Sequence, residues 1–88
     1  MGEQFVYLIK LLKDDYELPH VEAFIDKDVA DFYYRKDLIY YRRQGWEIEE
    51  DNSVCGVYVT NRAAMRRMTK EGPETATLLM ERYEITKN

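Results

Sequence analysis

The residue types best suited to nucleophilic catalysis are rare in this chain. Its 88 residues include one cysteine (Cys55), one histidine (His20) and one serine (Ser53). A catalytic cysteine needs a neighbouring base and a lowered pKa, whereas Cys55 lies in an apolar segment typical of a buried strand. One serine and one histidine leave little room for a hydrolase triad. We therefore expect no enzymatic activity.

Candidate metal and phosphate ligands have the wrong number or spacing. A single His and a single Cys cannot build a zinc finger or a His-rich site. Residues 26–31 begin like a calcium loop, but Ala30 and Asp31 stand where that loop needs Asp or Asn and then Gly. Helix capping explains these acids better. The glycines are too dispersed for a phosphate-binding loop. We expect no metal and no cofactor.

The bulk composition predicts one small domain over residues 1–88. The chain has 17 acidic and 13 basic residues, a net charge of −4, and 45% hydrophobic residues. No apolar run approaches the roughly 18–20 residues of a membrane span, and no secretory signal pattern is present at the N-terminus. With one unpaired cysteine, this predicts a cytoplasmic protein with no membrane association. The acidic balance makes nucleic acid a less favoured partner.

The elements expected to position any site form an α+β fold. Alternation of apolar residues predicts strands at 4–13, 20–25, 46–50 and 54–60. Capping acids, terminal arginines and Gly45 predict a long helix over residues 26–44. A short basic helix is expected over 62–70, and residues 75–86 fit a strand or a helix, with the strand favoured. The predicted order is ββαββ(α)β, a small antiparallel sheet with the long helix packed across it.

The long helix carries more apolar surface than one side needs. A first stripe is expected to face the core: Val29, Phe32, Tyr33, Ile39 and Tyr40. A second group widens the band: Ala30, Tyr34, Leu38 and Tyr41. Tyr34 and Tyr41 either lie along the sheet margin with their hydroxyls in water, or form an interface anchor with Leu38 and Arg42. The second interpretation predicts a homodimer or another protein partner at these four residues.

The segment 62–70 supplies an alternative surface. As a helix, it would place its four cations opposite Ala64, Met65 and Met68. Such a helix could contact phosphates, bind an acidic protein, or pair with acids of its own chain. The basic patch consists of Arg62, Arg66, Arg67 and Lys70.

The composition is typical of small accessory proteins of phages or mobile elements, which bind and inhibit a larger host protein. The leading hypothesis is therefore a non-enzymatic protein-binding module that forms a homodimer through the aromatic helix face. The alternative is a small nucleic-acid-binding or regulatory protein that uses the basic helix.

Overall fold

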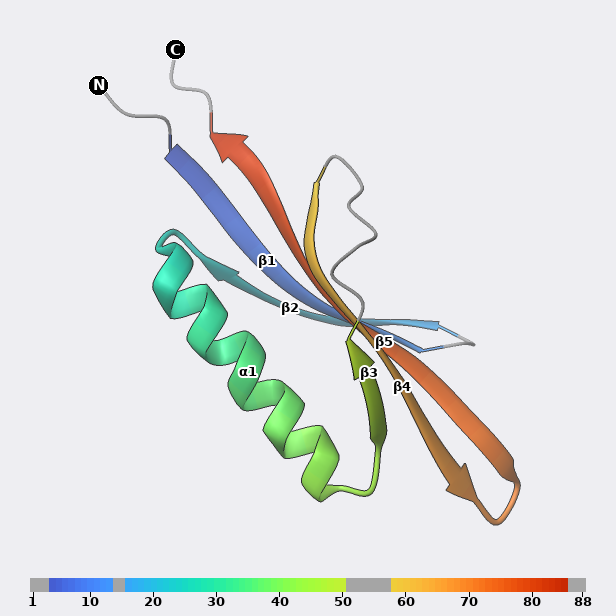
Figure 1. Ribbon diagram of the computed structural model, residues 1–88. Helices are drawn as coiled ribbons and strands as arrows, with labels where there is room; N and C mark the ends of the chain where they lie inside the picture. The colour runs from blue at the N-terminus through green and yellow to red at the C-terminus, as the bar shows by residue number, and fades with distance from the viewer. Residues whose placement is uncertain (1–3, 14–15, 51–57, 86–88) are drawn as a thin grey trace.

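The computed structural model describes residues 4–13, 16–50 and 58–85. In this part of the chain the elements are β1 (Gln4–Lys13), β2 (Tyr16–Phe24), α1 (Lys27–Arg43), β3 (Glu47–Glu50), β4 (Val59–Thr69) and β5 (Gly72–Ile85). The strands form one antiparallel sheet in the order β2-β1-β5-β4-β3 (Figure 1). Helix α1 connects β2 to β3, the two edge strands, and therefore has to pass from one edge of the sheet to the other.

The predicted fold is wrong, because the structure has one helix and a five-stranded antiparallel sheet, with no second helix in the described residues. The segment expected to form the basic helix is strand β4, which pairs with β3 on one side and β5 on the other. Ala, Arg and Met favour helices in isolation, but pairing along two neighbouring strands outweighs that local preference. Gly72 and Pro73, which follow the segment predicted to be that helix, begin β5.

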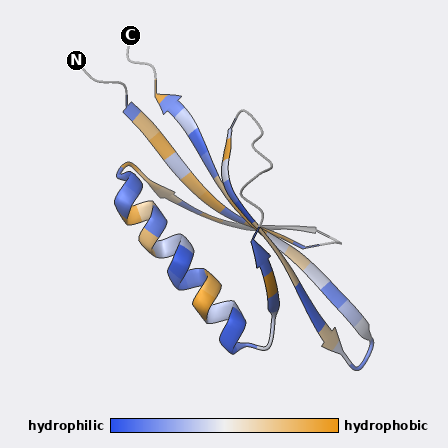
Figure 2. Ribbon diagram, in the orientation of Figure 1, coloured by the Kyte–Doolittle hydropathy of each residue, from blue (hydrophilic) through white to orange (hydrophobic). Residues whose placement is uncertain are grey.

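Several individual elements were predicted correctly. Strand β1 has the expected bounds of 4–13, β2 (16–24) contains residues 20–24 of the strand expected at 20–25, and residues 75–85 of the segment 75–86 are a strand within β5. Strand β1 is hydrophobic along most of its length in Figure 2, and it pairs with β2 along one edge and with β5 along the other. The turn expected at 51–53 and most of the strand expected at 54–60 lie outside the described residues.

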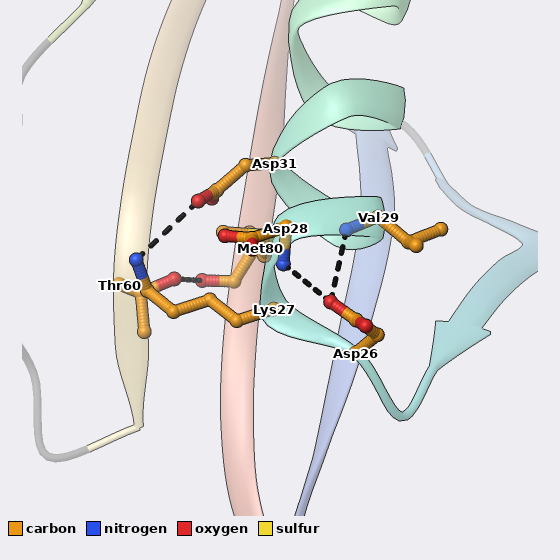
Figure 3. Close-up of polar contacts among 7 residues, drawn as sticks. All are labelled: Asp26, Lys27, Asp28, Val29, Asp31, Thr60 and Met80. Atoms are coloured by element: carbon orange, nitrogen blue, oxygen red, sulfur yellow. Dashed lines mark hydrogen bonds and ion pairs between the residues drawn. The ribbon is translucent and has the colours of Figure 1, made fainter.

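Helix α1 confirms the helix expected over 26–44 and is capped at both ends by side-chain or backbone groups. The Asp26 carboxylate accepts hydrogen bonds from the backbone N–H groups of Asp28 (2.8 Å) and Val29 (3.3 Å), as Figure 3 shows. At the other end, the N–H of Gly45 donates to Arg42 O (3.1 Å) and that of Trp46 donates to Tyr41 O (3.1 Å). This pair of bonds is a Schellman motif, and Gly45 adopts the positive φ of 93° that it requires.

The core lies between α1 and one face of the sheet. Strands β1, β5 and β4 contribute alternate side chains to it, and Trp46 enters it directly after the helix ends. The opposite face of the sheet is not covered by a second layer of described residues (Figure 1). The fully or nearly fully buried side chains are Tyr7, Ile9, Ala30, Tyr34, Leu38, Trp46, Ala63, Met65, Ala76, Leu78 and Met80.

Candidate protein-binding surface

The side of α1 that faces the sheet is the opposite of the one expected. Ala30, Tyr34 and Leu38 recur every four residues and are at most 5% exposed. Ala30 has only a methyl group and is completely buried, which lets the helix backbone come close to the sheet. The Schellman motif at the other end directs Trp46 into the same core. Together these contacts set the rotation of the helix about its axis.

The stripe assigned to the core therefore lies largely in solvent, so that prediction is wrong. Tyr33 alone among its members packs partly against the core, with its ring stacked on Phe24 at a centroid distance of 5.0 Å. The other four members are exposed, and so is Ile25, which lies next to the N-cap. These five side chains are 42–73% exposed. On a regular helix the four α1 members lie within an arc of about 100°. We call this set the outer stripe: Ile25, Val29, Phe32, Ile39 and Tyr40.

This rotation of α1 buries two of the four residues expected to anchor a partner and leaves the other two at least partly exposed. Tyr34 and Leu38 are buried against the sheet and are not available to a partner, whereas Tyr41 is half-buried and Arg42 is exposed. Burial, and secondarily the charge of Glu50, raises the pKa of Tyr34. Its hydroxyl is buried and has no hydrogen-bond partner among the described residues. Tyr34 is thus a core residue with an unsatisfied polar atom.

Tyr41 lies at the boundary between core and solvent. Burial is the main cause of its raised pKa, with smaller contributions from the negative charges of Asp37 and Glu22 and from Tyr40. Its ring makes an edge contact with Tyr40, with centroids 5.3 Å apart. Because Tyr40 is exposed, this contact links the core to the outer stripe.

The predicted basic patch is divided between two faces of the sheet. Successive side chains on a strand point to opposite faces, so Arg62 and Arg66 share the uncovered face and Arg67 lies on the α1 side. The Arg67 guanidinium lies 4.6 Å from the Trp46 ring centroid and contacts the Glu74 carboxylate at 2.8 Å. Lys70 is in the turn between β4 and β5. The four cations therefore do not form one surface.

The uncovered face of the sheet is mixed in character. Near its middle, Lys10 Nζ lies 2.7 Å from Glu81 Oε1, and the Tyr83 hydroxyl donates to Glu81 Oε2 at 3.1 Å. Burial and the hydrogen bond to Glu81 raise the pKa of Tyr83. Towards β3 the face has a hollow of about 430 Å³ whose charged lining residues are Glu47, Glu49 and Arg66. Lys10, Glu81 and Tyr83 thus satisfy one another. The same face also carries exposed apolar side chains, Val21 (45%) and Met68 (70%), which lie on the strands β2 and β4.

The described residues contain no cluster suited to binding a metal ion. No three His, Cys, Asp or Glu side chains of the described residues come together where they could hold a metal ion. His20 belongs to β2, whereas Ser53 and Cys55 lie outside the described residues. The structure therefore does not test whether His20 could act as a base for either of them. No helix of the described residues is long and apolar enough to cross a membrane.

Sequence reasoning placed four members of the outer stripe in the core: Val29, Phe32, Ile39 and Tyr40. The excess width of the apolar band was the correct signal that part of it is exposed. The small residue Ala30 is the signal that could have identified the buried side, because close helix–sheet approach favours a methyl group. No protein-family model, no curated protein and no solved structure was found to match this chain.

Proposed function

We propose that this protein is a non-enzymatic protein-binding module that contacts its partner through the outer stripe of α1. The observation that carries the proposal is the exposure of five apolar side chains, each at least 42% exposed: four along one side of α1, and that of Ile25 directly before its N-cap. Isolated exposed apolar residues are common, whereas a contiguous group of them marks an interaction surface. A helix that presents such a stripe fits the helix-in-groove and helix-on-helix modes of recognition.

The free energy available from covering this stripe is large enough for specific association. Complete burial of one large apolar side chain contributes about 1.5–3 kcal/mol. Since the stripe residues are roughly half exposed, covering all five would contribute on the order of 5 kcal/mol before the cost of association is subtracted. The rings of Phe32 and Tyr40 add rigid contact area of the kind enriched at binding hot spots.

The nucleic-acid alternative has weaker support. It depended on four cations on one helix, and these residues belong to a strand and its turn with Arg67 facing away from Arg62 and Arg66. The more specific hypothesis, inhibition of a host protein by a phage or mobile-element accessory protein, concerns the identity of the partner and stays a prediction.

Site-specific photo-crosslinking in the expressing cell tests the proposal. A benzoylphenylalanine in place of Phe32 is expected to give a discrete protein adduct, either with another protein or with a second copy of the chain. The same group in place of Glu71, which is exposed in the β4–β5 turn, is the matched control. Adding Ile39→Ser and Tyr40→Ser should remove the adduct at position 32. Equal adducts at both positions, or none at position 32, would refute the proposal.

A further inference from the structure

The charges of α1 are segregated along its length. The N-terminal part contains Asp26, Asp28 and Asp31, of which Asp31 pairs with Lys27 at 3.3 Å within the helix. The C-terminal part has an exposed basic cluster: Arg35, Lys36, Arg42 and Arg43. This order suits the helix dipole. It also makes the helix surface complementary to itself when a second helix runs in the opposite direction.

Three of these charges lie along one flank of the outer stripe. Asp28, Arg35 and Arg42 are seven residues apart in turn, and all three are exposed. Seven residues correspond to about two helical turns, so the three side chains project in nearly the same direction. Lys36 falls within the arc of the outer stripe itself, and its ammonium lies 5.5 Å from the Tyr33 ring centroid. The apolar stripe thus has an acid-to-base row along one side.

We infer that the occupant of the outer stripe is a second copy of this chain, with the two α1 helices antiparallel about a two-fold axis near Arg35. The inference rests on the proposed function and names its partner. In an antiparallel pair related by such an axis, the same flank of each helix meets, so Asp28 lies beside Arg42 of the second copy, and Arg42 beside the second copy's Asp28. In a two-fold symmetric parallel pair, this row would instead lie beside the opposite flank of the second helix, so Asp28 and Arg42 of the two copies would not meet.

The same two-fold symmetry has the opposite consequence for Arg35. A residue on the two-fold axis meets its own copy, so the two Arg35 side chains bring like charges together. Replacing Arg35 with the uncharged Gln is therefore expected to tighten the dimer about two- to threefold. In an assembly with a different protein, Arg35 has no such symmetry-imposed neighbour.

A charge-swap series tests the antiparallel arrangement. Asp28→Arg alone and Arg42→Glu alone each replace two symmetric attractive contacts with repulsive ones, and each should raise the dimer Kd about tenfold. The double variant Asp28→Arg/Arg42→Glu restores opposite charges at both contacts and should return the Kd to within about threefold of the original. Sedimentation equilibrium over a wide concentration range measures these constants. Asp26 is left unchanged because it caps the helix.

Matched controls separate a local contact from a general effect of net charge. Glu71→Arg and Lys70→Glu make the same changes of charge in the β4–β5 turn and should leave the Kd unchanged. Far-ultraviolet circular dichroism of each variant checks that α1 remains folded. A double variant that dimerises no better than the single variants would overturn the antiparallel arrangement.

The outcome also distinguishes this inference from the proposed function. If the wild-type chain stays monomeric at all concentrations while the position-32 crosslinker captures a different protein, the inference is wrong and the protein-binding function stands. If the chain is monomeric and position 32 gives no adduct, both are refuted. A wild-type dimer whose Kd responds to the single swaps, and recovers in the double, supports both.

Discussion

Leu38 and Ile39 are neighbours on α1 with side chains of equal size, but only Leu38 faces the sheet. Leu38 is 5% exposed and packs in the core, whereas Ile39 is 50% exposed in the outer stripe. Truncation of a buried Leu to Ala removes its transfer free energy and leaves a cavity, at a cost of about 2–5 kcal/mol. We therefore expect Leu38→Ala to lower the free energy of unfolding by at least about 2 kcal/mol.

Ile39→Ala serves as the matched variant at the adjacent position. Its side chain loses little buried surface, and Ala has a higher helix propensity than Ile by a few tenths of a kcal/mol. The expected change is within about 0.5 kcal/mol of zero in the monomer. For a domain of this size, about 1 kcal/mol corresponds to a Tm shift of roughly 4–8 °C, so the two variants should differ by at least about 6 °C.

Thermal and urea denaturation, followed by circular dichroism at concentrations below any dimer Kd, measure both changes. High dilution matters because association through the outer stripe would add stability that Ile39→Ala removes. If Ile39→Ala were as destabilising as Leu38→Ala in the monomer, or more so, the assignment of the buried side of α1 would be refuted, and with it the outer stripe.

Three further predictions concern the core and its boundary. Tyr34→Phe removes a buried hydroxyl without a partner and should raise the free energy of unfolding by about 1 kcal/mol in urea denaturation, whereas Tyr40→Phe, at an exposed position, should not change it; a loss of stability in Tyr34→Phe would show that the hydroxyl is in fact bonded. Burial raises the pKa of Tyr34 in the folded state, so the unfolded state loses the Tyr34 proton first as the pH rises. The contribution of Tyr34 to the free energy of unfolding is therefore complete below about pH 10. Above that pH it is lost, at up to about 1.4 kcal/mol per pH unit. Denaturation at pH 9–12 should show a shallower decline for Tyr34→Phe than for the original chain, and identical declines would contradict the assigned burial. Gly45→Ala should cost about 1 kcal/mol from the positive φ of 93° alone, since an added Cβ would meet no atom within 4 Å; a neutral result in the same denaturation assay would mean that the Schellman motif is absent.

How far the fold could be predicted depends on the range of the interactions that form each element. The ends of α1 were predictable because Asp26 bonds to N–H groups two and three residues away, and Gly45 completes a motif within the last turn. Strand β1 was predictable because its alternating apolar side chains are visible in ten consecutive residues. Strand β4 was not, because what holds residues 59–69 extended is pairing with β3 and β5 rather than any local preference.

The candidate surface also depends partly on local sequence and partly on long-range contacts. The sequence alone determined that α1 has too much apolar surface for one buried side, and it identified the residues among which that surface is distributed. Only the tertiary structure decided which part is buried. A helix with apolar side chains over a wide arc can rotate about its axis at little local cost. Its rotation is therefore set by the sheet, by the close approach at Ala30 and by the entry of Trp46 into the core. These contacts turn Tyr34 and Leu38 inward and leave the outer stripe in solvent.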